Sequence, residues 1–474
     1  MHSLRIGNTR ELFWDDYLID TSRTTAYLKQ HAPVPGEVVM TFDRPWEGDG
    51  CNYWSVVRLE KGYRMYHLAW NMLNEDGTRH TKDVIRVCCL ESSDGIHWTR
   101  PMLELRPFGQ WAKTNILLDD RDGVFDNFHV FLDENPVCPP EEKFKATARC
   151  DKSGYLWCWT SADGYSWKKA WKMTDKGTFD SQNVAFWSPE HGKYFCFTRG
   201  FHDLTSEKWW SGTRDIRCMT SADFHTWTEP VLLDFGNSED LALYTNGVSR
   251  YPRAPQMMLG FPTRYIERRE WTENFDQLTG ADARKKRMTI QPRFGLAATD
   301  CVLMTSRDGV RWNRGSEAWI TPGIERDGNW VYGDCYPAVG MIQTPSPLPG
   351  APDEYSLFVK EGHWSQKPAL LRRYTVRMDG FRSFRADNTP CTLVTKPLVY
   401  EGGRLHLNFS TSAKGSIHVT LHCGDAQLHS CELFGSTLDR IVPFDGDPAP
   451  FSGKEITLEF TMSDADLYSM QFTQ

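Results

Sequence analysis

The stretch Ser92-Ser93-Asp94-Gly95-Ile96-His97-Trp98 is one copy of a pattern that recurs along this chain of 474 residues. The pattern is Ser-x-Asp-Gly-x-x-Trp. It returns at residues 161–167, at 221–227, where Phe224 stands in the Gly position, and at 306–312, and a degenerate fifth copy occupies 379–384. The aspartates of the five copies are 69, 60, 85 and 71 residues apart. A repeat of this kind organises most of the sequence.

Each copy has the chemistry of a turn between two strands. Asp can bond its own backbone, and Gly tolerates a positive φ. The Trp then enters the next strand and can pack between neighbouring sheets. Runs with strand character precede the copies, at 63–69, 144–149, 194–198 and 257–261. Five units that each hold four strands predict an all-β protein with a five-bladed β-propeller; the alternative is a set of unrelated β-turns.

The composition changes after residue 386. Residues 390–474 contain no Trp and no copy of the repeat, but short alternating runs such as 405–412, 416–423 and 456–462. We therefore predict two domains, a catalytic propeller at 1–386 and a C-terminal β-sandwich at 387–474. Residues 267–294 lengthen the fourth unit, as a solvated loop or as a lid or oligomer contact beside the site.

Composition excludes several classes of protein. The net charge of −8 argues against nucleic acid or an anionic membrane as the main partner, and it suits a neutral ligand better than an anionic one unless a local site opposes it. No apolar run approaches the length of a membrane span, and the first residues lack the apolar core of a signal peptide. The 13 Cys are scattered without framework or zinc spacings. We expect reduced thiols in a cytoplasmic protein.

Several segments carry a resemblance to known enzymes. They are 11–20, 43–47, 307–309 with Glu317-Ala318 and Pro322-Gly323, and 464–472. Together with the repeat they resemble uncharacterised bacterial relatives of glycoside hydrolase family 32, and the propeller alone looks like families 43 and 130. The invertase motif Trp-Met-Asn-Asp-Pro-Asn-Gly is absent, as are the Arg-Asp-Pro and Glu-Cys motifs, so neither fructosyl specificity nor a retaining mechanism is implied.

The resemblance implies that catalytic carboxylates stand where the inner strand of a blade meets the propeller axis. Glycoside hydrolysis needs an acid and a base or nucleophile, and a third carboxylate often tunes the acid. By this analogy Asp49 is the base or nucleophile, Asp126 the positioning carboxylate, and Asp180 the acid. Glu317 and Glu361 are the alternatives for the acid. Each Asp could instead be a turn residue that precedes a strand.

A sugar site combines flat rings with fixed hydrogen-bonding groups. The candidates for substrate binding lie near the predicted acids. They are Trp54, His129, Gln182, Asn183, Trp187, Tyr244, Asn246, Arg253, Arg264, Tyr265, Asp334, His363 and Trp364. The four Trp of the repeat are better explained by blade packing, and Arg264 could bind an anionic sugar group or form an ordinary ion pair.

The sequence thus predicts a glycoside hydrolase that acts on an oligosaccharide by two-carboxylate catalysis in the propeller funnel. The alternatives are a glycan-binding propeller without catalysis, and a phosphorylase whose phosphate subsite would use Arg253, Arg264 or His363. We expect no cofactor, and no metal, since no ligand spacing supports one. A homo-oligomer is left open.

Overall fold

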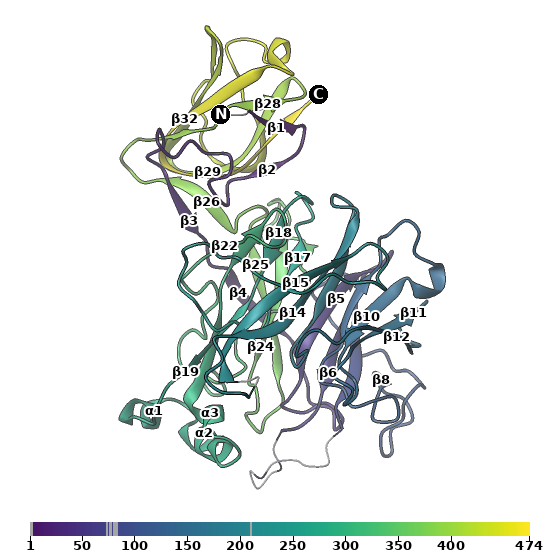
Figure 1. The fold of residues 1–474 in the computed structure, drawn as a ribbon. Helices are drawn as coiled ribbons and strands as arrows, with labels where there is room; N and C mark the ends of the chain where they lie inside the picture. Colours follow the sequence, from purple (N-terminus) through teal and green to yellow (C-terminus); the bar gives the residue numbers. More distant parts are fainter. Residues whose placement is uncertain (1–2, 73, 75–77, 79–83, 209–210) are drawn as a thin grey trace.

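The structure is a computed structural model that describes residues 3–72, 74, 78, 84–208 and 211–474. It is built almost entirely of antiparallel β-sheet. Five four-stranded sheets form the blades of a propeller, and a separate ten-stranded sheet forms the second part of the molecule. In Figure 1 the ten-stranded sheet lies at one end of the propeller, and three short helices lie at the opposite end. The predicted fold class, a five-bladed propeller with a C-terminal β-sandwich, is confirmed.

The first three blades follow the chain in order, from the inner strand outward. Blade 1 comprises β5 (Asn52–Arg58), β6 (Tyr63–Ala69), β7 (Arg86–Ser92) and β8 (Ile116–Leu118). Blade 2 comprises β9 (His129–Leu132), β10 (Phe144–Ala148), β11 (Leu156–Ser161) and β12 (Lys168–Thr174). Blade 3 comprises β13 (Val184–Ser188), β14 (Lys193–His202), β15 (Thr213–Ser221) and β16 (Val231–Leu232).

The fourth blade carries the insertion and the fifth closes the ring. Blade 4 comprises β17 (Ser249–Arg250), β18 (Met258–Gly260), β21 (Met304–Ser306) and β22 (Asn313–Arg314). A ribbon of β19 (Thr263–Glu267) and β20 (Ala297–Cys301) extends it and leads to α1 (Glu273–Gln277), α2 (Ala281–Met288) and α3 (Arg293–Leu296). Blade 5 comprises β23 (Ile342–Thr344), β24 (Glu354–Glu361), β25 (Leu370–Val376) and, as its outer strand, β4 (Val34–Thr41).

The repeated motif joins the third strand of a blade to the fourth. In the four full copies the Ser hydroxyl accepts the N–H of the Gly position, as from Gly95 to Ser92 at 2.8 Å, and the Asp accepts the next two N–H groups. Its Trp packs on the preceding blade in three copies: Trp98 on Phe358, Trp167 on Tyr66 and Trp312 on Phe197, with ring centroids 5.4–5.9 Å apart. The predicted packing of the repeat Trp is therefore confirmed at these three positions.

The ten-stranded sheet draws on both ends of the chain. Its C-terminal strands are β26 (Arg382–Ala386), β27 (Cys391–Val394), β28 (Leu398–Tyr400), β29 (Arg404–Cys423), β30 (Ala426–His429), β31 (Ser436–Ile441) and β32 (Glu455–Thr473). The N-terminal strands β1 (Leu4–Gly7), β2 (Glu11–Leu12) and β3 (Tyr27–Gln30) pair with β28, β32 and β26. The division into 1–386 and 387–474 stays a prediction, but residues 4–30 and 382–386 are hydrogen-bonded into the second part.

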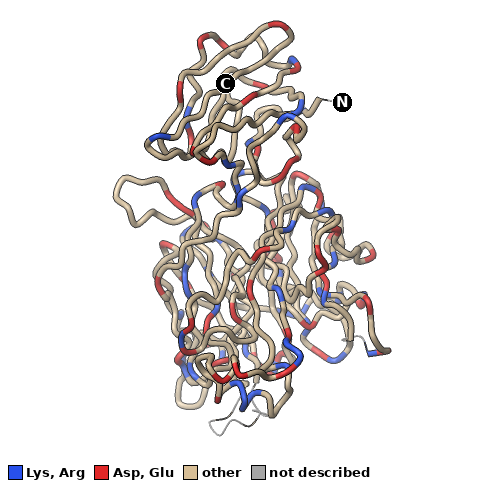
Figure 2. The backbone as a smooth tube through the Cα atoms, turned by 90° about the vertical axis from the view of Figure 1, so that its left-hand side faces the viewer, with Lys and Arg blue, Asp and Glu red and all other residues tan. Residues whose placement is uncertain are grey.

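Charge and thiols are arranged simply. Acidic and basic residues are interspersed over both parts of the backbone, so the net negative charge does not form one face (Figure 2). All thirteen cysteines are free, and nine of them are buried. Among the described residues no helix has the length and apolar character needed to cross a bilayer.

Candidate functional site

Asp126 and Asp180 lie on neighbouring blades, just before the inner strands β9 and β13. The Asp126 carboxylate is 46% exposed and pairs with Arg149 Nη1 at 3.1 Å. The Asp180 carboxylate pairs at 3.3 Å with Arg199 Nη1, whose side chain is only 2% exposed. Burial and the nearby negative charge of Asp180 raise the pKa of Asp126, and Arg149 opposes the rise. The two carboxyl groups therefore interact electrostatically, and their catalytic roles stay a prediction.

Asp180 opens onto a pocket of about 580 Å³ at the helical end of the propeller. Its lining is rich in charge and aromatic surface: Asp180, Arg199, Phe201, Ser211, Gly212, Arg214, Tyr244, Glu267, Gln291 and Arg293. Three arginines and two carboxylates thus face one cavity. Of these ten residues the sequence analysis had named only Asp180 and Tyr244.

The pocket residues that sequence reasoning missed come from strands away from the axis and from the insertion. Arg199 lies on β14, Arg214 on β15, Glu267 at the end of β19 and Arg293 at the start of α3. No local motif surrounds them. The one signal in the sequence was the long insertion of unit four, which the structure brings to the mouth of the funnel.

A cluster of tyrosine rings, here called the tyrosine wall, packs behind the pocket, and Tyr244 is the member that lines it. The ring of Tyr244 lies 5.6 Å from Tyr332 and 5.7 Å from Tyr336, centroid to centroid, and the Arg199 guanidinium lies 4.1 Å from its centre. Tyr53 joins this group with a left-handed backbone, φ +56°, and burial raises the pKa of its phenol. Within the described part of the chain the buried hydroxyl of Tyr336 has no hydrogen-bond partner. Rings with polar edges of this kind suit the CH faces and hydroxyls of a sugar.

Asp49 has a different environment from Asp126 and Asp180. Its carboxylate is buried and accepts the main-chain N–H of Met72 at 3.1 Å and of Gln366 at 3.0 Å. Burial raises its pKa, and these two bonds oppose the rise. Asp49 lines a separate pocket of about 240 Å³. Because both of its oxygens hold backbone, Asp49 connects two loops, which differs from the role of base or nucleophile that the sequence suggested.

Behind the tyrosine wall lies a buried group of ionisable side chains. The ammonium nitrogen of Lys360 contacts Nδ1 of His363, whose ring stacks on Trp364 at 4.1 Å. Burial lowers the pKa of Lys360 to about 7 and depresses that of His363 further. Burial also raises the pKa of Asp334 to about 7; one of its oxygens accepts the N–H of Val331, and the other has no hydrogen-bond partner among the residues that the structure describes. The predicted binding residues in this group are Asp334, His363 and Trp364. They are 2–6% exposed, so they pack behind the tyrosine wall and do not line the pocket.

The two glutamates proposed for the acid lie elsewhere. The Glu361 carboxylate forms ion pairs with Arg326 at 2.5 Å and with Arg372 at 2.8 Å, so two guanidinium groups compensate its charge. Glu317 is exposed beyond β22, the outer strand of blade 4. Neither residue lines the pocket that contains Asp180.

The predicted arginines form structural ion pairs. Arg253 pairs with the buried Asp379 at 3.1 Å, where the propeller meets the second part. Arg264 forms a bidentate ion pair with Asp300, with N–O distances of 2.9 and 2.6 Å. Tyr265 lies beside the pocket and donates its hydroxyl to Glu267 at 2.6 Å.

Four further candidates hold the blades together near the axis. Gln182 donates to the carbonyl of Trp54, and Asn246 donates to the carbonyl of Gln182. Asn183 donates to Asn127, Phe179 and Ser181. Trp54 itself is buried between blades 1 and 5 and stacks on His67 at 6.3 Å. Amides near the axis of a propeller satisfy main-chain groups that neighbouring blades leave open.

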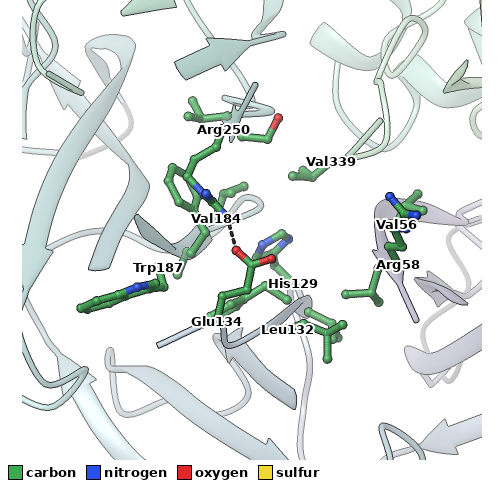
Figure 3. Close-up of a pocket in the computed structure, with 17 residues that line it drawn as sticks. Val56, Arg58, His129, Leu132, Glu134, Val184, Trp187, Arg250 and Val339 are labelled. Carbon is green, nitrogen blue, oxygen red and sulfur yellow. Dashed lines mark hydrogen bonds and ion pairs between the residues drawn. The ribbon is translucent and has the colours of Figure 1, made fainter. Parts of the chain in front are cut away.

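His129 and Trp187 line a second cavity, the axial channel, of about 210 Å³. Figure 3 shows inner-strand residues from several blades around it, including Val56, Val184 and Val339, with an ion pair between Arg250 and Glu134. Nδ1 of His129 is buried without a partner among the described residues, and burial lowers the pKa of this ring to about 4. The channel is lined mostly by apolar side chains, and Glu134 is the one carboxylate among its described lining residues, so the helical end is the candidate site.

One group of possible metal ligands was found among the described residues. His202, Asp203 and Asp240 bring their ligand atoms within 4.8 Å of one another. His202 already bonds Asp240 at 3.0 Å and Asp215 at 3.2 Å, and these carboxylates raise its pKa. The imidazole is therefore satisfied as a hydrogen-bonded group between two acids.

Comparison with known proteins gives matches among solved structures only. No family model matches the chain, and no curated protein matches it. An N-acetylgalactosamine deacetylase from F. plautii is 14% identical with a TM-score of 0.43, covering 73% of this chain and 94% of its own. An exo-β-1,3-galactanase from Phanerochaete chrysosporium is 11% identical with a TM-score of 0.38, covering 94% and 100%.

A catalytic domain of a GH62 α-L-arabinofuranosidase from Coprinopsis cinerea is 10% identical with a TM-score of 0.42, covering 73% and 97%. These three proteins are named for more than one reaction on carbohydrates. The chain is a five-bladed propeller that is similar, at low sequence identity, to solved structures of carbohydrate-active enzymes.

Proposed function

We propose that this protein hydrolyses a glycosidic bond in the pocket at the helical end of the propeller. The observation that carries the proposal is the pair Asp126 and Asp180 on neighbouring blades, of which Asp180 lines the pocket and Asp126 interacts electrostatically with it from outside the pocket lining. The Asp180 carboxylate pairs with the buried Arg199 at 3.3 Å, whereas burial and the charge of Asp180 raise the pKa of Asp126. Acid–base hydrolysis of a glycoside requires one carboxyl group that keeps its proton, as a raised pKa favours, and a second carboxylate beside it.

The catalytic roles follow from the raised pKa of Asp126 and the ion pair of Asp180 with Arg199. Asp126 donates its proton to the leaving glycosidic oxygen, and Asp180 acts as the base that activates water or as the nucleophile at the anomeric carbon. This reverses the order expected from the sequence, in which Asp126 tuned the acid. Glu267 lies in the same pocket and is available to sugar hydroxyls. The finer kinship with family 32 remains part of this proposal.

Asp180→Asn and Asp126→Asn test the proposal on a panel of oligosaccharides and aryl glycosides. On oligosaccharides we expect kcat/KM to fall roughly 10²-fold or more in both variants, a usual contribution of acid–base groups. On aryl glycosides with good leaving groups, which need no proton, Asp126→Asn should retain much more activity than Asp180→Asn. Asp120→Asn, an exposed carboxylate outside the pocket, is the control.

Two results would redirect the interpretation. If the wild-type chain binds sugars but turns over no glycoside, the glycan-binding alternative replaces hydrolysis. If turnover requires inorganic phosphate, the protein is a phosphorylase. The residues suggested for a phosphate subsite, Arg253, Arg264 and His363, do not line the pocket.

A further inference from the structure

The pocket of the proposed site contains more positive than negative charge. Of its three arginines, Arg199 is neutralised by Asp180 at 3.3 Å. Neither Arg214 nor Arg293 forms an ion pair with a carboxylate of any described residue. The remaining acid of the pocket, Glu267, accepts a hydrogen bond from Tyr265. The pocket thus has three arginines against two carboxylates, a local excess of positive charge in a chain whose net charge is −8.

Aromatic rings hold the two unpaired guanidinium groups in place. Cζ of Arg214 lies 4.3 Å from the ring centre of Tyr265 and 5.7 Å from that of Tyr244. Cζ of Arg293 lies 4.8 Å from the ring centre of Phe294 and 5.5 Å from that of Tyr332. A ring orients a guanidinium without neutralising its charge or occupying its whole hydrogen-bonding fork.

The protein also leaves these groups short of acceptors. Nε of Arg214 and Nη1 of Arg293 are buried and have no hydrogen-bond partner among the described residues. A buried N–H without an acceptor carries a free-energy cost, so a ligand that draws the guanidinium into a better set of bonds is favoured. An anion in the pocket would offer these guanidinium groups the acceptors that the surrounding side chains do not supply.

The elements that supply these groups explain the insertion in the fourth unit. Arg214 comes from β15 of blade 3, while Gln291 and Arg293 come from the segment between β19 and β20 that carries the helices. The insertion therefore completes the charged side of the pocket and is more than a solvated loop.

A carboxylate fits this pocket better than inorganic phosphate. The planar carboxylate matches the fork of a guanidinium and carries one charge. Asp180 and Glu267 share the same cavity, and their charges would repel a phosphate dianion more strongly than a monoanion. The volume of about 580 Å³ lies within the range of small-molecule sites and accommodates a sugar residue.

We propose that Arg214 and Arg293 bind a carboxylate on the sugar, so that the substrates of this protein are uronic-acid glycosides. The inference rests on the proposed function insofar as the bound sugar is called a substrate, but the binding that it predicts does not depend on catalysis.

Binding is measured first, by calorimetry or saturation-transfer NMR with the full chain. The probes are glucuronate and galacturonate, their methyl esters, and glucose and galactose. We expect at least one uronate to bind more tightly than its ester and its neutral counterpart, with affinity that falls as salt rises. Arg293→Gln and Arg214→Ala should each weaken that binding about 10-fold, as loss of a charge-assisted hydrogen bond does. Lys286→Ala, an exposed cation on α2, should leave it unchanged.

Arg293→Lys serves as the conservative variant, since it retains the charge and loses the fork. It should bind the uronate with an affinity between those of the wild type and Arg293→Gln. The Arg293 series also keeps the test decisive if an Arg214 variant fails to fold. Equal binding of uronates and neutral sugars would overturn the inference, and so would phosphate displacing the uronate at lower concentration than the uronate itself binds.

Hydrolysis of 4-nitrophenyl glucuronide and glucoside separates the two proposals. Uronate binding with no hydrolysis of any glycoside sustains this inference and removes the proposed function. Hydrolysis of neutral glycosides only, with no uronate binding, does the opposite.

Discussion

Single residues in this site are governed by what the backbone around them donates and accepts. Asp49 and Asp180 both stand before an inner strand, yet Asp49 is capped by two main-chain N–H groups whereas Asp180 faces an arginine and a cavity. The same residue type thus holds loops in one blade and is available to a ligand in another. What differs is the set of partners, which only the folded chain supplies.

Asp334 gives a prediction at this scale, because it is fully buried with one oxygen unpartnered. Its neighbours include Glu361, which raises its pKa, and Arg326 and Arg287, which lower it. Burial leaves its pKa at about 7, so between pH 4 and 7 the folded state holds a proton that the unfolded chain has lost. Stability from this group is therefore complete below pH 4 and declines as pH rises through 7.

Asp334→Asn removes this decline, since an amide stays neutral. The measured quantity is the free energy of unfolding of the variant minus that of the wild type. We expect this difference to be about 2–4 kcal/mol more favourable to the variant above pH 7 than at pH 4. Urea unfolding across this pH range measures it, with the exposed Asp120→Asn as control. A difference between variant and wild type that does not change with pH would contradict the assignment.

At the scale of elements, the repeated turn determines how blades pack. Three of the four copies have Gly with φ between +73° and +82° after the Asp, and Phe224 adopts φ +64° in the third copy. The Phe224 ring is buried against Tyr194 and Trp227, and this packing offsets the backbone cost of its position. The sequence pattern therefore tolerates a non-Gly residue only where that side chain has a place in the core.

Gly164→Ala and Gly192→Ala separate the two costs of such a turn. A Cβ at Gly164 would lie 2.4 Å from the Tyr66 hydroxyl and 2.6 Å from Arg64 Nη1, whereas one at Gly192, φ +59°, meets nothing within 4 Å. We expect Gly192→Ala to cost about 1 kcal/mol for the left-handed backbone alone. Gly164→Ala should cost about 2–4 kcal/mol, because the clash is added. Chemical denaturation of both variants measures the difference; equal losses would mean that blade contacts at Gly164 yield freely.

At the scale of the whole molecule, the chain crosses between its two parts more than once. Strands β1–β3 lie in the second part, β4 returns to close blade 5, and the chain leaves the propeller again after β25. The degenerate fifth repeat stands at this last crossing. Its Asp379 is buried and, instead of bonding its own turn, accepts from Tyr251 at 2.6 Å, Ser469 at 2.7 Å and Asn408 at 3.1 Å, and pairs with Arg10 and Arg253.

Asp379→Ala should therefore destabilise the whole molecule. Removing one partner from a buried charge network leaves Arg10 and Arg253 without compensation, at a cost of about 3–5 kcal/mol. Calorimetry should show a lower Tm, and Asp387→Ala, an exposed acid paired with Arg385, should not. A change below about 1 kcal/mol would show that the two parts are held together by the shared strands alone.

The sequence by itself determined the features that arise from residues close together in the chain. The Asp of each repeat bonds N–H groups two and three residues ahead, so its motif revealed the turns, the blades and the change to a sandwich. It also placed Asp126 and Asp180 before inner strands of adjacent blades. It could not reveal that residues 4–30 pair with the C-terminal strands, since strand pairing across the whole chain leaves no local pattern.

Only the tertiary structure decided which side chains share the pocket. Arg199, Arg214, Glu267 and Arg293 become neighbours when two blades close around the axis and the insertion folds over their end. It also decided which candidates are not available, because Glu361, Arg253 and Arg264 have their charges paired by residues distant in the sequence or across a strand pair. Periodicity reports which residues form a strand, whereas a binding site depends on contacts between segments, and those exist only once the ring is closed.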